Sequence, residues 1–258
     1  MNVLELFSGT GSVGKVCKEI GWSVISLDID PRADIVCDIL EWDYTTYPKD
    51  YFSLIWASPP CTEYSCMNYC RPEKVCDLES ADKLVKKTLE IIKYFSPCIW
   101  FIENPQTGKL KKREFMKDVP FYDVSYCMYS DWGYEKKTRI WTNKKDWNNQ
   151  LCDKSGACGN MIDSQHKSVL GNGYEMVDGK KVLCNTKALR KKHRLNVSKD
   201  VHTVGEQFEK EKLRMKHKST CDGGYDKRKK KVEGQINAGT TLLDRYRIPA
   251  DLIFSLLQ

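Results

Sequence analysis

The residue best suited to nucleophilic chemistry is Cys61, which ends the sequence Ser-Pro-Pro-Cys. Two prolines restrict the backbone of this segment and so fix the direction in which the thiol points. A thiol with a pKa of about 8.5 is only a few per cent thiolate at neutral pH, but it is intrinsically very nucleophilic. A buried thiol is one alternative. A metal site with Cys66, Cys70 and Cys76 is another, although their spacings do not match the C-x2–4-C pairs typical of zinc.

Two further side chains could assist such a nucleophile. Glu103 opens the sequence Glu-Asn-Pro directly after an apolar run, and an acid in apolar surroundings is suited to donate a proton to a ring nitrogen. Arg139 ends the sequence Lys-Lys-Thr-Arg and offers a guanidinium on a predicted strand. Taken singly, Glu103 is more simply a loop cap and Arg139 a routine charged strand end.

A glycine-containing turn and two acids together suit an adenosine-bearing cofactor. The turn Phe-Ser-Gly-Thr-Gly ends at Gly11, and glycines there let backbone N–H groups approach a ligand at a helix N-terminus. Asp28 lies seventeen residues after Gly11, where a carboxylate can accept hydrogen bonds from ribose hydroxyls. Asp38, ten residues later, could accept from an exocyclic amine. Each of these features alone could equally be a tight turn or a capping acid.

A second set of possible metal ligands lies in the C-terminal half. Cys152, Cys158 and His166, with Cys184 further along, are residue types that bind zinc. Their spacing is irregular, so thiols without a metal under a loop-rich surface are the simpler interpretation. The sequence therefore predicts no metal site.

Alternating strand and helix patterns would position the chemical groups. Apolar runs predict strands over residues 3–7, 24–27, 52–57 and 98–102, and helical periodicity predicts helices over residues 13–20 and 78–95. Repeated βα units imply an α/β fold with a doubly wound, mostly parallel sheet and helices on both faces. Ligands bind such sheets outside the carboxyl ends of the strands, so Gly11, Asp28, Cys61 and Glu103 are expected along one edge.

The second half of the chain is less regular. Two more strands are predicted, over residues 121–129 and 138–142, and a helical pattern returns over residues 242–257. We therefore predict three parts. Residues 1–142 form the catalytic, cofactor-binding domain, residues 143–232 form an inserted basic region, and residues 233–258 return to the main domain.

The charge is unevenly distributed. The chain carries +7, but residues 143–232 hold 22 Lys and Arg against 11 Asp and Glu, a net charge of +11, which leaves −4 on the remainder. A basic segment beside a mildly acidic body indicates a polyanion such as nucleic acid. A solvated Lys-rich surface would have the same composition.

Membrane and secretory features are not recognised in the sequence. No run reaches the roughly 18 apolar residues of a spanning helix, and the N-terminus does not resemble a signal peptide. Without a secretory signal, the twelve cysteines are expected to be reduced thiols. These observations predict an intracellular protein with no membrane partner.

The ordered set of motifs resembles the DNA cytosine-5 methyltransferases. Leu-Phe-Ser-Gly-Thr-Gly, Asp-Ile-Asp, Cys-Asp-Ile, Ser-Pro-Pro-Cys, Ile-Glu-Asn-Pro and Lys-Lys-Thr-Arg-Ile-Trp occur in the order of that family. The Glu-Asn-Pro variant and the closing Arg-Tyr-Arg-Ile-Pro resemble compact members from phages and large DNA viruses. The resemblance implies a Rossmann-like S-adenosylmethionine-dependent methyltransferase fold, with double-stranded DNA as the substrate and residues 143–232 as the target-recognition region.

The resemblance also implies roles at a flipped cytosine. Cys61 would attack C6, Glu103 would hold or protonate N3, and Arg139 would contact O2. The resemblance implies three further residues at this catalytic site: Asn104, Lys137 and Ser65. Of these, Lys137 would assist Arg139, and Ser65 would contact a phosphate.

For the cofactor, S-adenosyl-L-methionine, the resemblance implies Asp28 on the ribose, Ile29 against the adenine and Asp38 near its amine. The remaining implied cofactor contacts come from the first turn and from the loop before the nucleophile: Phe7, Ser8, Gly9, Thr10, Gly11 and Pro59.

The chain departs from the family pattern at three places. The usual Glu-Asn-Val is Glu-Asn-Pro, the usual Gln-x-Arg-x-Arg is Glu-Lys-Lys-Thr-Arg at residues 135–139, and the usual Gly-Asn-Ser-Val near the C-terminus is not recognisable. Methylation of RNA is one alternative function, and a silent nucleic-acid-binding module is another. The presence of Cys61, Glu103 and Arg139 argues against the silent module. A monomer is expected.

Overall fold

The computed structural model describes residues 1–66, 68, 73, 75–162, 165–167, 174–177, 180–183, 236–237 and 246–258. The chain divides into two compact units. The first unit consists of Met1–Asp131, Glu135–Gly159 and Arg247–Gln258, and the second consists of Trp132–Tyr134 and Asn160–Tyr246.

The first unit extends past residue 142, the predicted end of the catalytic domain. The Trp147 ring packs against Tyr122 and Tyr129, with centroids 5.3 and 6.3 Å apart, and its indole N–H donates to Ser255 Oγ at 3.0 Å. These contacts hold residues 143–159 in the first unit. The chain therefore leaves that unit at residue 160 and returns at Arg247, later in both cases than predicted.

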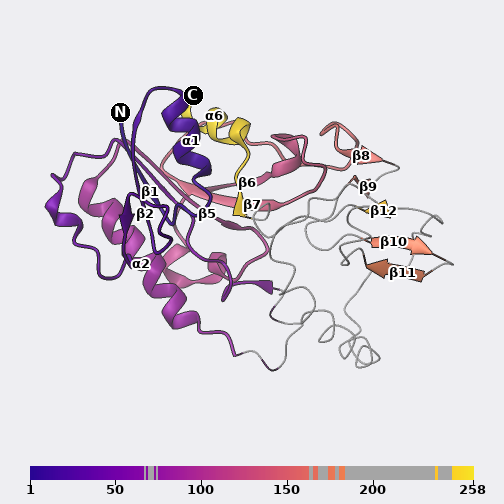
Figure 1. The fold of residues 1–258 in the computed structure, drawn as a ribbon, viewed down its shortest axis with the longest axis horizontal. Coiled ribbons are helices and arrows are strands. Elements are labelled where there is room, and N and C mark those ends of the chain that lie inside the picture. Colours follow the sequence, from indigo (N-terminus) through magenta and orange to yellow (C-terminus); the bar gives the residue numbers. More distant parts are fainter. Residues whose placement is uncertain are drawn as a thin grey trace. The chain divides into compact units, whose positions relative to one another are not determined.

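The first unit is built on a seven-stranded sheet with the order β3-β2-β1-β4-β5-β7-β6 (Figure 1). β1, β2, β3, β4 and β5 run parallel, and β7 is antiparallel to both β5 and β6. The predicted Rossmann-like, mostly parallel sheet is therefore confirmed. The strands are β1 (Asn2–Leu6), β2 (Ser23–Asp28), β3 (Ile35–Val36), β4 (Leu54–Ala57), β5 (Ile99–Pro105), β6 (Phe121–Ser125) and β7 (Lys137–Thr142).

Helices cover both faces of this sheet, with α1 (Ser12–Glu19) and α6 (Ala250–Leu257) side by side on one face and α2 (Leu78–Phe95) on the other (Figure 1). Successive strand residues point to opposite faces. Leu4 and Leu6 accordingly share the main core with Val85 of α2. Glu5, between them, points the other way and accepts hydrogen bonds from the start of α1.

Three predicted elements end at other residues. β5 runs to Pro105 rather than 102, so Glu103 and Asn104 lie within the strand and pair with β7. The strand predicted over 121–129 stops at Ser125, because the short 3-10 helix η5 (Tyr126–Met128) follows. Within the helix predicted over 242–257, Tyr246 is helical, residues 247–249 interrupt the helix, and α6 runs from Ala250 to Leu257 after the extended Pro249. Residues 242–245 lie outside the described residues.

The second unit contains short antiparallel strands. β8 (Met161–Ile162) pairs with β9 (Gln165–His166), and β10 (Tyr174–Val177) pairs with both β11 (Lys180–Leu183) and β12 (Ile236–Asn237). Most of the basic segment, including the run at residues 227–231, lies outside the described residues. Among the helices that are described, none has both the length and the apolar composition needed to cross a membrane.

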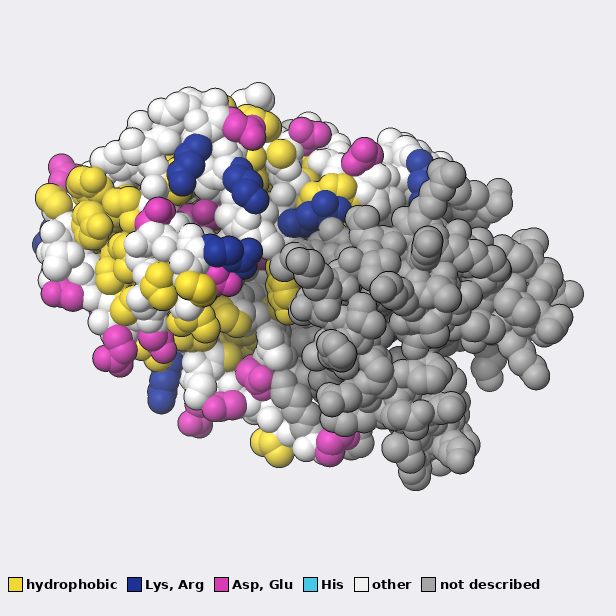
Figure 2. All heavy atoms as spheres, viewed as in Figure 1, with side chains coloured by type: hydrophobic (Ala, Val, Ile, Leu, Met, Phe, Trp, Pro, Cys, Tyr) yellow, Lys and Arg dark blue, Asp and Glu magenta, His cyan; other side chains and the backbone are white. Residues whose placement is uncertain are grey.

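Charged side chains of both signs are interspersed over the described part of the face shown in Figure 2. This distribution agrees with the small net charge of −4 outside residues 143–232. The strong basic excess of the sequence is therefore a property of the inserted segment, whose main part is not described.

Candidate active site

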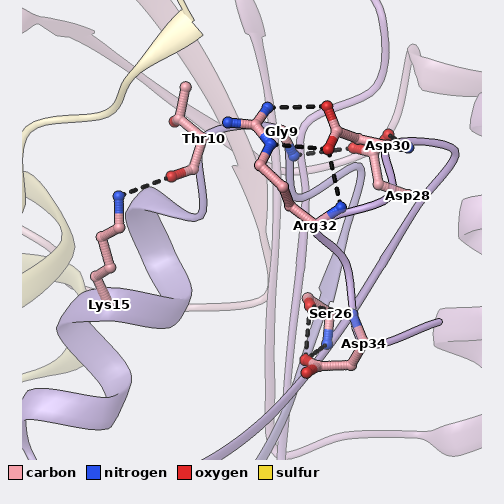
Figure 3. Close-up of polar contacts among 8 residues, drawn as sticks. All are labelled: Gly9, Thr10, Lys15, Ser26, Asp28, Asp30, Arg32 and Asp34. Atoms are coloured by element: carbon pink, nitrogen blue, oxygen red, sulfur yellow. Dashed lines mark hydrogen bonds and ion pairs between the residues drawn. The ribbon is translucent and has the colours of Figure 1, made fainter. Parts of the chain in front are cut away.

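The turn between β1 and α1 has an unusual backbone. Phe7, Gly9 and Gly11 have φ angles of 57°, 48° and 65°, in the left-handed region that glycine adopts without steric cost. The Gly9 N–H donates to Asp28 Oδ2 at 2.9 Å, and the Asp30 N–H donates to Asp28 Oδ1 at 3.0 Å (Figure 3). Asp28 thus ties the turn to the carboxyl end of β2.

The surroundings of this turn fit an adenosine-bearing cofactor. A Cβ atom on Gly11 would meet nothing within 4 Å, so there is open space at the start of α1, where backbone N–H groups favour an anion or polar ligand. Ile29 is 75% exposed beside Asp28 and offers an apolar surface for a ring. Asp38 accepts from the Leu40 N–H at 2.9 Å. The proposed contacts of these residues with the cofactor remain predictions.

Glu5 supports the same turn and was missed in the sequence. It is 4% exposed, and its two carboxylate oxygens accept from the N–H groups of Val13 and Gly14 at 3.1 and 3.0 Å. Burial raises its pKa to about 7, although these two hydrogen bonds oppose the shift. A Cβ on Gly14 would lie 2.6 Å from Glu5 Oε2. The sequence feature that could have identified Glu5 is an acidic residue within the apolar run of β1, shortly before a helix whose N-cap residue, Gly11, has no side chain to accept the first N–H groups.

An ion pair at the end of β2 was also missed. Arg32 donates from Nε and Nη2 to the two carboxylate oxygens of Asp30, at 2.8 Å each (Figure 3). The Arg32 guanidinium lowers the pKa of Asp30 to about 2. The Asp30–Arg32 ion pair therefore lies two residues after Asp28, the carboxylate predicted to bind the ribose.

The loop that carries Cys61 is attached to β5. Asn104 is 1% exposed, and its Nδ2 donates to the carbonyl oxygen of Pro59 at 2.9 Å. Its Oδ1 is buried and has no hydrogen-bond partner among the described residues. Through this bond, the ends of the parallel strands β4 and β5 are held together, as the sequence predicted for Cys61 and Glu103.

A second attachment follows the nucleophile. Tyr64 is fully buried, and its hydroxyl donates to Asp82 of α2 at 2.8 Å. Asp82 also accepts from Arg113 Nε at 2.9 Å. The Tyr64 carbonyl accepts from the Lys109 N–H at 2.8 Å. The Cys61 segment is thus bound to β5 on one side and to α2 on the other.

Charged groups surround the half-buried Cys61. Burial raises the pKa of its thiol, the negative charge of Glu103 raises it further, and Lys136 lowers it. Glu103 itself is 6% exposed, and its Oε1 accepts from the Tyr126 hydroxyl at 3.1 Å and lies 3.4 Å from Lys136 Nζ. Lys136 and Tyr126 are therefore part of the site, although the sequence had not singled them out.

The Arg139 side chain does not lie beside Glu103. It lies opposite Asn104 in the β5–β7 register, whereas Glu103 lies opposite Ile140, so the Arg139 and Glu103 side chains point to opposite faces. The Arg139 guanidinium donates to both carboxylate oxygens of Asp123, at 2.7 and 2.9 Å, and its Cζ lies 3.5 Å from the centroid of the Phe121 ring. Its predicted contact with a cytosine remains a prediction.

Two other predicted residues lie further out. Lys137 is exposed and lies 3.7 Å from the Glu135 carboxylate. Ser65 lies in the turn after Cys61, where its N–H donates to the Thr62 carbonyl at 3.4 Å. Their roles remain predictions.

The metal alternative for Cys61 receives no support from the part of the chain that is described. There, the ligand-type side chains that lie close enough to share an ion do not include Cys61, Cys66 or Cys76. Cys70, one of the proposed partners, lies outside the described residues, and Cys76 Sγ lies 3.9 Å from Lys109 Nζ.

No known protein-family profile matches the sequence. The "Probable DNA (cytosine-5)-methyltransferase" of Frog virus 3 (isolate Goorha) is 39% identical over 173 residues, which are 62% of this chain and 79% of that protein.

Solved structures that resemble this chain have lower sequence identity to it. A prophage-encoded E. coli protein assigned as a DNA modification methyltransferase is 15% identical, with a TM-score of 0.44, over 69% of this chain and 58% of that chain. A methyltransferase from Entamoeba histolytica is 16% identical, with a TM-score of 0.41, over 59% of this chain and 55% of that chain. The chain thus spans little more than half the length of these two structures.

Proposed function

Because the chain belongs to the DNA cytosine-5 methyltransferase family, we propose that it methylates C5 of cytosine in double-stranded DNA, with Cys61 as the nucleophile. S-adenosyl-L-methionine is the proposed methyl donor. Of the region predicted for target recognition, residues 143–232, the proposed target-recognition part begins at residue 160, because residues 143–159 belong to the first unit. The proposed site of action is intracellular, with the protein acting as a monomer.

The cofactor would be held at the carboxyl ends of β1 and β2. When bound, it supplies an electrophilic methyl group on a sulfonium sulfur. The turn at Gly9 and Gly11 would present backbone N–H groups to it, Asp28 would accept from its ribose, and Ile29 would cover its adenine ring. The open space beside Gly11 and the exposure of Ile29 support this assignment.

The remaining residues would act on the cytosine. Extruding the base from the duplex costs a few kcal/mol, offset by contacts in the pocket. As the Cys61 sulfur adds to C6, its thiol proton would pass to Glu103 and from there to N3, which makes C5 nucleophilic toward the methyl group. After methylation, a base removes the C5 proton, the C6–sulfur bond breaks, Cys61 leaves as a thiolate and the N3 proton returns to Glu103.

The observation that carries this proposal is the electrostatic grouping of Cys61, Glu103 and Lys136. The raised pKa of the Cys61 thiol means that it is mostly protonated before substrate binds. Lys136 is the nearby positive charge that favours the thiolate, and it also contacts the Glu103 carboxylate. A nucleophile, an acid and a cation are therefore held at one edge of the sheet.

Covalent trapping tests the nucleophile. DNA that carries 5-fluorocytosine at the target should form a stable protein–DNA adduct, because fluorine cannot leave C5 as a proton does. Cys61→Ala should abolish both the adduct and methyl transfer, while cofactor and DNA binding stay close to those of the wild type. Denaturing gel electrophoresis and peptide mapping would identify the attached residue.

The internal control is Cys66→Ala, which removes another half-buried thiol five residues away and should still trap DNA. An adduct on the Cys61→Ala protein, or full activity of that variant, would show that Cys61 is not the nucleophile. Running the same assay with RNA of matched sequence would separate the DNA proposal from an RNA substrate.

A further inference from the structure

Three cysteines that are distant in the sequence meet in the first unit. The Sγ atoms of Cys127, Cys152 and Cys158 all lie within 4.8 Å of one another. In a tetrahedral zinc site, with Zn–S bonds of about 2.3 Å, neighbouring sulfurs lie about 3.8 Å apart. The three thiols therefore need to move little to share one ion.

The backbone around these cysteines is already held in place. Cys127 lies in η5, directly after β6, and the segment that carries Cys152 and Cys158 is bonded to the same region. The Ser125 N–H donates to the Gln150 carbonyl at 3.1 Å, and the Gln150 N–H donates to the Tyr129 hydroxyl at 2.8 Å. These bonds bring the thiols together without requiring a metal, so the ligand set is preorganised.

Cys127 and Cys152 are buried, and Cys158 is partly buried. A bound dication favours the deprotonated form of such thiols, so the three side chains can bind it as thiolates.

We propose that Cys127, Cys152 and Cys158 of the first unit bind one structural Zn²⁺ ion. Three thiolates are common to the Cys₄ and Cys₃His ligand sets of structural zinc sites. The ion would fix the segment through which the chain leaves the sheet toward the basic insertion. The irregular spacing of Cys152 and Cys158 favours unligated thiols, and it gives no sign of Cys127, which lies 25 residues before Cys152.

Metal content of the full chain tests this site. Protein purified under reducing conditions, without added chelator, should contain about one zinc per chain by atomic emission spectrometry. Replacing the zinc with Co²⁺ should give the intense visible bands of a tetrahedral site and a thiolate charge-transfer band. Cys127→Ser, Cys152→Ser and Cys158→Ser should each lose most of the metal.

Two variants serve as controls. Cys17→Ser removes a buried thiol from α1 and Cys98→Ser removes an exposed thiol; both should keep one zinc.

Purified protein that contains no zinc and takes up none after reduction would overturn the proposal. A Cys127–Cys152 disulfide in place of the metal would do so as well, as would equal metal loss in the Cys98→Ser control.

Discussion

At the scale of single residues, Glu5 gives the fold a specific pH dependence. Its pKa is about 7 in the folded chain, against an ordinary value of 4.5. Between these values the folded state binds more protons than the unfolded state, so the free energy of unfolding should fall as pH rises from about 4.5 to about 7. The decrease is bounded by about 3 kcal/mol, and it should level off above pH 7.

Urea unfolding at pH 5 and pH 8 measures this effect. Glu5→Gln keeps a carbonyl acceptor for the start of α1 but cannot ionise, so its stability should change less between the two pH values than that of the wild type. Glu19→Gln, an exposed change in the same helix, should follow the wild-type profile. Identical profiles for the wild type and Glu5→Gln would contradict the assignment.

Asp28 has two tasks that one substitution can separate. It holds the Gly9 N–H and is the proposed acceptor for the ribose hydroxyls. Asp28→Asn keeps an acceptor oxygen for the turn but removes the charge. A hydrogen bond to a charged group contributes about 1.5–3 kcal/mol, so cofactor affinity should fall roughly 10- to 150-fold. Calorimetric titration with S-adenosylmethionine measures the change.

The matched control is Asp34→Asn, since the Asp34 carboxylate bonds to Ser26, away from the Gly9 turn (Figure 3). Its cofactor affinity should equal that of the wild type. If both variants bind equally well, Asp28 does not contact the cofactor.

At the scale of elements, α2 positions the nucleophile through Tyr64. The Tyr64 hydroxyl bonds to Asp82, which is 5% exposed. Tyr64→Phe removes this bond and leaves Asp82 paired with Arg113, so we expect a loss of stability of about 1–2 kcal/mol. The Cys61 segment should become less well ordered, and the rate of trapping on 5-fluorocytosine DNA should fall more than cofactor affinity.

Tyr44→Phe is the matched control for this prediction, because the Tyr44 hydroxyl bonds to Glu90 of the same helix, away from the Cys61 segment. It should leave the trapping rate unchanged. Equal trapping rates for Tyr64→Phe and the wild type would show that α2 does not position the nucleophile.

The elements themselves were largely predictable, whereas their contacts were not. Apolar runs and helical periodicity located β1, β2, β4, α1 and α2 within a few residues, because burial on a sheet depends on local pattern. The run Tyr-Cys-Met at residues 126–128 was taken for a strand and forms η5. An apolar run of that length does not distinguish a strand from a short helix.

The site was predictable only where its residues follow strand ends. Cys61 follows β4 and Glu103 lies near the carboxyl end of the neighbouring parallel strand β5, so the prediction that they share one edge needed no three-dimensional information. The pairing of Glu103 with Lys136, and of Arg139 with Asp123, depends on the antiparallel register of β5, β7 and β6. A shift of one residue exchanges the two faces, and no spacing within the chain specifies that register. The proximity of Cys127 and Cys152 was also not predictable, because it depends on the contact between the end of β6 and the segment that contains Gln150.

At the scale of the whole molecule, charge is divided between a mildly acidic sheet unit and a basic insertion. Residues 143–232 carry a net charge of +11, and the described surface of the first unit shows both signs interspersed (Figure 2). We therefore expect the insertion to supply most of the DNA affinity through phosphate contacts. Such binding weakens with salt, with a log–log slope of about −0.9 for each phosphate contacted.

Neutralising two lysines in each part of the chain tests this division. Lys191→Gln with Lys192→Gln should weaken DNA binding and reduce the salt slope by up to about 1.8, if each lysine contacts one phosphate. Lys83→Gln with Lys93→Gln makes the same change in net charge on exposed positions of α2, and should alter neither quantity appreciably. Fluorescence anisotropy at several salt concentrations gives both values. If the two double variants behave alike, only the total charge matters, and the basic insertion is a solvated surface rather than the DNA-binding region.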